Sequence, residues 1–342
     1  DNAADSLAKG LKFIKRWKNK SPRITPIFGP HANYTLNEAQ LRAVRQAAID
    51  ADVAIAIHMS ESLYEVEYSK KHYGKTSVEF FDDIGLFDVP TIGAHLVWPT
   101  ETEIPLLAER RVGVIHNPTS NMKTAAGIAP VVKMLEAGVR VGLGTDGAAS
   151  NNDLDMWEEI RLAAFMAKTR ESDPTALPAK QAMLMATRMG AEAMHIGDIT
   201  GSLEAGKRAD LILVDLNTLH NSPRFHRDPD GIYAQLVYAA KSTDVTDVMV
   251  NGRWVMQDKE LTTIDLPALM ENADEYAKNI DHFLIKREQS VLSKLIAIGG
   301  ATEGESYEVQ AKVQISDPEV IIESLSAPEI EIVYTRHYQE YD

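Results

Sequence analysis

The chain has 342 residues, a hydrophobic fraction of 44% and a formal net charge of −15. This acidic balance argues against nucleic acid or an anionic membrane as the main partner, because both attract basic surfaces. The chain has no cysteine, which excludes disulfides and thiolate metal ligands. No apolar run approaches the roughly 18 residues of a membrane-spanning helix. These features favour an acidic soluble enzyme, and the lack of cysteine fits a reducing compartment such as the cytoplasm.

Five short apolar runs, each with an ionisable residue at or near its end, fill the first half of the chain. They span 24–31, 53–61, 91–97, 111–118 and 139–146 and carry His31, His58, His95, His116 and Asp146, respectively. Their average spacing of about 29 residues is close to one β–helix–β unit. The segments between them show capping-box spacings at 37–40, 76–79 and 100–103, which indicate helices. The alternation predicts an α/β domain whose parallel sheet, open or closed, is covered by helices.

The pattern changes after residue 200. Short strands with glycine turns follow, and Asn251-Gly252 between two β-rich arms predicts a hairpin. Residues 266–300 have a helical pattern, and 301–342 return to strand and helix. We therefore expect four parts: an α/β domain in 1–200, a small β module in 201–265, a helical segment or linker in 266–300, and a short α+β tail in 301–342.

The ionisable residues at the strand ends predict a functional site. In parallel α/β folds, ligands bind at the carboxyl ends of the strands, where these side chains would converge. A single histidine in such a place is usually structural, but five consecutive strands of this kind favour a site. Imidazoles and carboxylates without cysteine suit zinc or iron as a Lewis acid. Asp146 could also cap a following helix, a role that is compatible with a place in the site, and Glu61, three residues after His58, could be a solvated loop carboxylate.

Four segments resemble the amidohydrolase superfamily. They are HMSE at 58–61, GAHLVWPTETEI at 93–104, HNPTSNMKTAAGIAPV at 116–131 and VGLGTDGAASNNDLDMWEEIRLAA at 141–164. The similarity points to the branch of 5-methylthioadenosine/S-adenosylhomocysteine deaminases and of triazine and chloro-hydrolases, and it runs from about residue 5 to 265. That family folds as a TIM barrel with a small β-sandwich. The resemblance therefore implies the C-terminal five β/α units of a (β/α)₈ barrel in 1–200 and part of the sandwich in 201–265.

The resemblance also implies roles around the metal. His58 matches the metal ligand on strand 5, and Asp146 matches the ligand on strand 8. Asp146 would also accept a proton from the attacking water. His95 matches the strand-6 histidine that orients or deprotonates that water.

Three residues match positions that face the substrate. Glu61 would hold a ring nitrogen of the substrate and relay a proton to it, and His31 would contact the substrate beyond the metal. His116 matches the strand-7 HNP segment and would line the pocket. Asp146 contacts the substrate as well in this assignment.

One element of the family pattern is absent. The family's first strand supplies a His-x-His pair to the metal, and this chain contains no such pair. We expect that the first three barrel strands precede Asp1 in a longer protein. We also expect that this chain alone does not hold zinc tightly and is inactive, because His58 and Asp146 are too few protein ligands for a zinc site.

The end of the chain carries a weaker resemblance. YEVQAKVQISDPEVIIESL at 307–325 and RHYQEYD at 336–342 resemble the opening of a CYTH domain. That family begins with a Glu-x-Glu-x-Lys strand, to which Glu308 and Lys312 correspond, but Gln310 replaces the middle acid. The alternative is an ordinary strand and helix in a C-terminal extension.

The resemblance implies a metal-dependent hydrolytic deaminase that releases ammonia from an adenosine-type substrate, a hydrolase of non-peptide carbon–nitrogen bonds in cyclic amidines. Its cofactor is one divalent metal, with zinc expected and iron as the alternative. Its partner is the small-molecule substrate, and the sequence leaves open whether the protein forms a homo-oligomer.

Three alternatives remain open from the sequence. Another amidohydrolase would cleave carbon–nitrogen or C–Cl bonds of a triazine, pyrimidine or guanine ring. A protein of a different class would be a non-catalytic fragment or a phosphate-binding or regulatory module. An open flavodoxin-like sheet has the right number of strands, but the chain shows no obvious phosphate-binding loop.

Overall fold

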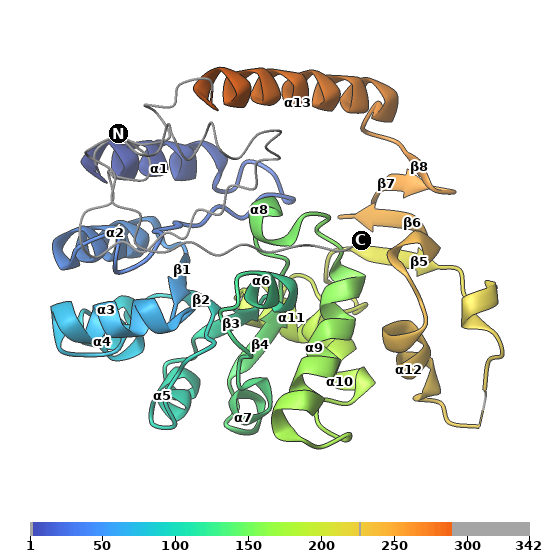
Figure 1. Cartoon of the computed structure of the whole chain (residues 1–342), viewed down its shortest axis with the longest axis horizontal. Helices are drawn as coiled ribbons and strands as arrows, with labels where there is room; N and C mark the ends of the chain where they lie inside the picture. Colours follow the sequence, from blue (N-terminus) through green and yellow to red (C-terminus); the bar gives the residue numbers. More distant parts are fainter. Residues whose placement is uncertain (1–2, 226, 289–342) are drawn as a thin grey trace, which may run out of the picture. The chain divides into compact units, whose positions relative to one another are not determined.

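The computed structural model describes residues 3–225 and 227–288. The chain divides into two units, Asp1–Asp265 and Leu266–Asp342 (Figure 1). The described part of the second unit is one helix, α13 (Leu266–Glu288), within the segment predicted to be helical. The CYTH-like prediction for 301–342 lies outside the described residues. Within the described part of the chain, no helix combines the length and apolar character that crossing a membrane requires.

A parallel sheet of four strands forms the centre of the first unit. The strands follow one another in space as in sequence: β1 (Ile55–Met59), β2 (Thr91–His95), β3 (Gly113–His116) and β4 (Arg140–Leu143). Because all neighbours are parallel, their carboxyl ends meet at one edge of the sheet. This edge is where the sequence predicts the site.

The first predicted strand, 24–31, is not a strand of this sheet. Only an isolated parallel bridge joins Phe28 to Ile55. Pro26 and Pro30 flank Phe28, and neither can donate a backbone hydrogen bond, so the ladder cannot extend. The segment still runs beside β1, since the His58 N–H donates to the His31 carbonyl at 3.0 Å.

Helices surround the parallel sheet (Figure 1). They are α1 (Ala3–Trp17), α2 (Glu38–Ala51), α3 (Leu63–Tyr73), α4 (Ser77–Asp83), α5 (Glu103–Glu109), α6 (Pro118–Lys123), α7 (Val131–Glu136), α8 (Ala148–Asn151), α9 (Met156–Glu171), α10 (Ala179–Met185) and α11 (Arg188–Ala193), with the 3₁₀ helix η1 (Leu86–Asp88). Capping boxes form at Asn37 and Gln40 and at Thr76 and Glu79, as predicted. At the third predicted position, the Glu103 carboxylate accepts the Thr100 N–H, although the helix begins only at Glu103.

Helix packing buries the parallel strands. In β1, Ile55, Ile57 and Met59 are at most 2% exposed, and together with the helices they form one continuous core. Helix α11 lies so close to β3 that a Cβ at Gly113 would approach the Ala193 carbonyl oxygen to 1.7 Å. Such burial leaves little room for polar side chains inside the strands.

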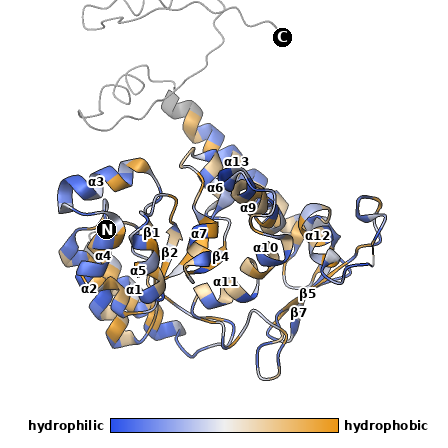
Figure 2. Ribbon diagram, turned by 90° about the horizontal axis from the view of Figure 1, so that it is seen from below, coloured by the Kyte–Doolittle hydropathy of each residue, from blue (hydrophilic) through white to orange (hydrophobic). Residues whose placement is uncertain are grey.

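The second sheet is antiparallel and less buried. It consists of β5 (Leu211–Val214), β6 (Val245–Val250), β7 (Arg253–Gln257) and β8 (Glu260–Leu261), in this spatial order. The predicted hairpin is confirmed, because Asn251 and Gly252 adopt positive φ between β6 and β7. The connections contain α12 (Gly231–Tyr238), η2 (Leu219–Asn221) and η3 (Ser242–Asp244). Figure 2 shows hydrophobic and hydrophilic residues mixed along these strands.

Candidate metal centre and active site

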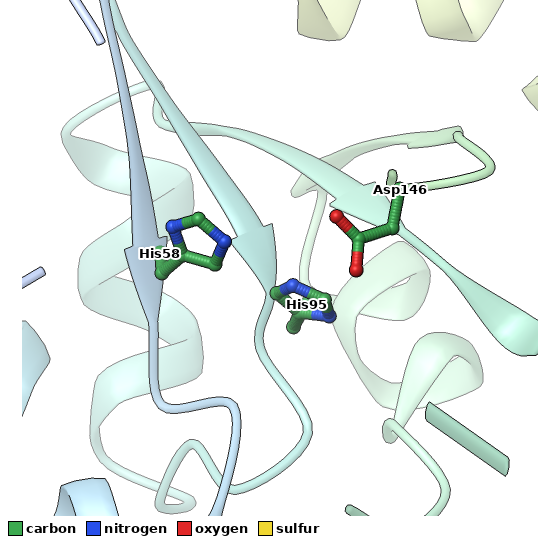
Figure 3. Close-up of side chains that lie close together, drawn as sticks. All are labelled: His58, His95 and Asp146. Carbon is green, nitrogen blue, oxygen red and sulfur yellow. The ribbon is translucent and has the colours of Figure 1, made fainter. Parts of the chain in front are cut away.

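His58, His95 and Asp146 form a cluster at the carboxyl edge of the parallel sheet. One potential ligand atom from each of the three lies within 4.8 Å of the other two (Figure 3). His58 belongs to β1, His95 ends β2, and Asp146 follows β4. The register pairs His58 with Ala94 and Met59 with His95, and the His58 and His95 imidazoles stack with centroids 5.4 Å apart. The structure thus brings together three of the five residues predicted at strand ends.

The His58 ring is oriented by a backbone carbonyl. Its Nδ1 lies 3.0 Å from the carbonyl oxygen of His31. Because a carbonyl oxygen can only accept, Nδ1 carries the proton and Nε2 keeps its lone pair. A hydrogen bond to the second ring nitrogen is the usual support of a metal-binding histidine.

His95 presents a buried nitrogen without a partner. Its Nδ1 lies 2.8 Å from Oδ1 of Asn121, which accepts a hydrogen bond from Nδ1–H, so that the lone pair lies on Nε2. The ring is fully buried, and Nε2 has no hydrogen-bond partner among the described residues. Buried acceptors are normally satisfied, so this atom fits a metal ion or a water molecule at the cluster. The left-handed backbone of His95, with φ of 75°, is also typical of residues held in place for function.

Asp146 is held as a carboxylate by hydroxyl groups. Its Oδ2 accepts hydrogen bonds from Ser120 Oγ at 2.8 Å and from Ser150 Oγ at 2.6 Å. Burial raises the pKa of Asp146, but the bonds from Ser150, Ser120 and the Gly147 backbone together bring the pKa below its ordinary value. The alternative that Asp146 caps a helix is wrong, because Gly147 occupies the N-cap of α8 without a side-chain bond. An ionised carboxylate with spare lone pairs suits a metal ligand or a proton acceptor.

Glu61 adjoins the cluster. Its Oε1 lies 3.9 Å from Nε2 of His95, and its side chain is 23% exposed. A merely solvated loop carboxylate would extend into water, so this placement favours a functional role. Glu61 thus lies beside the cluster and is partly open to solvent.

The two remaining predicted residues differ in burial. His31 is exposed, and its ring lies 4.8 Å from that of His58, centroid to centroid. Burial and the neighbouring His58 lower the pKa of His31. His116 is 1% exposed at the end of β3, and burial together with His95 lowers its pKa to about 3, which keeps it neutral. Substrate contact by either histidine stays a prediction.

Sequence reasoning missed the residues that support the cluster. Ser120 and Asn121 lie on α6, which begins with Pro118 at its first turn, and they reach Asp146 and His95. Both belong to the HNPTSN segment. The motif therefore marked these residues as part of the site, but it did not indicate which side chains they contact.

A buried carboxylate on α9 anchors the same helix. Glu159 is fully buried and accepts hydrogen bonds from the Thr119 N–H at 3.1 Å and from Asn151 Nδ2 at 2.7 Å. Burial raises the pKa of Glu159 above its ordinary value, although both bonds oppose this. Glu159 therefore ties α6 to α8, which flanks Asp146.

Comparison with known proteins places the chain in a family. The sequence profile of the amidohydrolase family matches residues 1–255. The chain belongs to this family. It is 46% identical over 274 residues to a 5-methylthioadenosine/S-adenosylhomocysteine deaminase of Dictyoglomus thermophilum, covering 80% of this chain and 63% of that protein. It is 42% identical over 281 residues to a 5'-deoxyadenosine deaminase of Methanosarcina barkeri, with 82% and 63% covered. This amidohydrolase chain thus spans a little less than two thirds of the length of these relatives.

Solved structures agree with the family assignment. A zinc-bound adenosine deaminase from Xanthomonas campestris superposes with a TM-score of 0.77 at 40% identity, over 81% of this chain and 62% of that one. A zinc-bound atrazine chlorohydrolase from Arthrobacter aurescens gives 0.73 at 28% identity, over 80% and 60%. These similarities and the helix-covered parallel sheet show an α/β fold of the TIM-barrel type.

Proposed function

We propose that the protein is a metal-dependent hydrolytic deaminase that releases ammonia from adenosine-type nucleosides, with 5-methylthioadenosine and S-adenosylhomocysteine as substrates. The cluster of His58, His95 and Asp146, with Glu61 3.9 Å from His95, carries this proposal. The names of relatives at 42% to 46% identity support the substrate class. The same proposal includes residues 1–200 as part of a (β/α)₈ barrel, with segment 24–31 beside β1 in place of a fifth strand, and the division of the chain after residues 200, 265 and 300.

The donor set of the cluster fits a divalent metal. The His58 imidazole with a free lone pair and the ionised Asp146 carboxylate are ligands that zinc prefers, and iron is the alternative. His58 and Asp146 would hold the ion. The bound ion supplies a Lewis acid that lowers the pKa of water towards about 7.

Three side chains orient the attacking water and transfer its proton. Asp146, kept ionised by Ser120 and Ser150, accepts a proton from the attacking water. His95, fixed by Asn121, orients that water through Nε2. Glu61 holds the ring nitrogen of the substrate and passes the proton to it. Water then replaces the amino group on the ring carbon, and the amine leaves as ammonia.

The proposal is tested with His58→Ala and His95→Ala variants of a protein that spans the full length of the relatives, because His58 and Asp146 alone are too few protein ligands for a zinc site. Both should reduce ammonia release from 5-methylthioadenosine by at least about 100-fold. Zinc affinity, measured by calorimetry, should fall only in His58→Ala, because His95 acts on water. An exposed histidine of α13 gives the matched control, His282→Ala, whose rate should equal that of the unmodified protein.

Three results would contradict this assignment. Unchanged ammonia release in His58→Ala would remove the deaminase assignment. Loss of zinc in His95→Ala would make His95 a third ligand. Chloride release from a chlorotriazine in place of ammonia release would favour the hydrolase alternative, to which the atrazine chlorohydrolase structure points.

A further inference from the structure

Glu65 is a buried carboxylate directly behind the active-site loop. It lies on α3 and is completely buried. One oxygen, Oε1, accepts the Ser60 N–H at 2.8 Å and the Ser77 hydroxyl at 2.6 Å, and the other, Oε2, accepts the Glu61 N–H at 2.8 Å. Three hydrogen bonds therefore satisfy a polar group that would otherwise be costly to bury.

Ordinary helix capping does not explain these bonds. Ser62 is the N-cap of α3 and accepts the Glu65 N–H, so Glu65 occupies the position of a capping-box acid. In the capping boxes of α2 and α4, the acid or amide side chain returns to the backbone N–H of the N-cap residue. The Glu65 carboxylate reaches further back, to the two residues before the N-cap.

Those two residues form the turn that aims Glu61. Strand β1 ends at Met59, and Ser60 adopts a left-handed backbone with φ of 49°, which a non-glycine residue rarely does. The Ser60 carbonyl also accepts the Trp98 N–H at 3.0 Å, so both sides of this residue are fixed. The next side chain along the chain is Glu61, 3.9 Å from His95.

We infer that Glu65 is a positioning residue that holds Glu61 against the metal cluster through the backbone of Ser60 and Glu61. Its catalytic consequence rests on the proposed function, in which Glu61 moves the proton. The support continues behind Glu65, since Ser77 also contacts the amide of Asn33, which in turn donates to Ser69. Glu65 thus links the loop of Glu61 to α3 and α4.

The test replaces the acceptor without changing its size. In a Glu65→Gln variant, the amide nitrogen cannot accept, so one backbone N–H of the loop loses its partner. We expect faster hydrogen exchange at the Ser60 and Glu61 amides and a kcat for 5-methylthioadenosine lower by about 10- to 100-fold, at unchanged zinc affinity. Glu67, exposed on the same helix, gives the matched control Glu67→Gln, which should change none of these.

A double-mutant cycle with Glu61→Gln decides whether Glu65 acts through Glu61. We expect Glu65→Gln to cause little further loss of kcat in the Glu61→Gln background, because the group that it positions is already gone. The inference would be overturned if the kcat losses of Glu65→Gln and Glu61→Gln multiply in the double variant. Unchanged hydrogen exchange at the Ser60 and Glu61 amides in Glu65→Gln would also overturn it. If Glu65→Gln does not fold, Ser77→Ala gives the same test. It removes only the hydrogen bond from the Ser77 hydroxyl to Glu65, so the expected changes in hydrogen exchange and kcat are smaller.

The two proposals can fail separately. If a protein that contains this chain and spans the full length of the relatives releases no ammonia from adenosine-type nucleosides, the proposed function fails. Hydrogen exchange at Ser60 and Glu61 still decides whether Glu65 holds the loop.

Discussion

The two sheets of the first unit place their ionisable residues in different ways. In the parallel sheet, most strand residues are buried, and the histidines stand at or near the carboxyl ends of β1, β2 and β3. In the antiparallel sheet, no residue of β5 to β8 is buried, and charged residues such as Asp247 and Arg253 lie within the strands. A buried strand can carry an ionisable group at low cost only where it ends. Burial therefore concentrates the chemistry of this protein at one edge of one sheet.

The largest expected effect compares an aspartate from each region. Asp146→Asn removes the carboxylate that accepts the proton, and ammonia release should fall by about 10²- to 10⁴-fold. Asp247→Asn, in β6, makes the same chemical change away from the cluster and should leave the rate within about twofold. Steady-state ammonia release measures both. Equal rates in the two variants would break the link between the parallel edge and catalysis.

The next comparison concerns stability and uses one isoleucine from each sheet. Ile57 is 2% exposed in β1, whereas Ile212 is 43% exposed in β5. Ile57→Ala should lower the free energy of unfolding by about 2–5 kcal/mol, because it leaves a cavity that the packed core cannot close. Ile212→Ala should cost below about 1 kcal/mol. Urea denaturation gives both values, and a larger loss at Ile212 would contradict the assignment of the core to the parallel sheet.

The main elements of the site could be predicted from the sequence because they obey a local rule. His58, His95 and Asp146 each follow an apolar run, and the carboxyl ends of parallel strands must meet. The hairpin at Asn251 was equally local, because its turn depends on two adjacent residues.

Other features depend on partners far along the chain. Asn121 contacts a histidine 26 residues earlier, and Ser120 contacts Asp146, 26 residues later. No short pattern encodes such distances, so these supports appeared only in the structure. The apolar run at 24–31 was predicted to be a strand of the sheet, and this prediction is wrong. Its hydrophobicity is typical of a strand, but Pro26 and Pro30 prevent the ladder of backbone hydrogen bonds from extending.

The smallest expected effect concerns acid stability and the burial of His116. Its pKa falls from 6.5 to about 3 in the folded protein, because burial and His95 both disfavour the charged ring. Between these values the unfolded chain binds the extra proton, so stability is fully present above about pH 6.5 and declines as the pH falls towards 3. From pH 7 to 5.5 the metal-free protein should lose about 1 kcal/mol through this group.

Urea unfolding at the two pH values measures this loss, and the comparison with His116→Gln isolates it. The variant lacks a titrating ring, so its stability should change less over the same interval by about 1 kcal/mol. The same pH dependence in both proteins would mean that His116 is accessible to protons in the folded state. The edge of the parallel sheet would then be open to water at β3 as well as at Glu61, and direct contact of His116 with substrate would become the stronger interpretation.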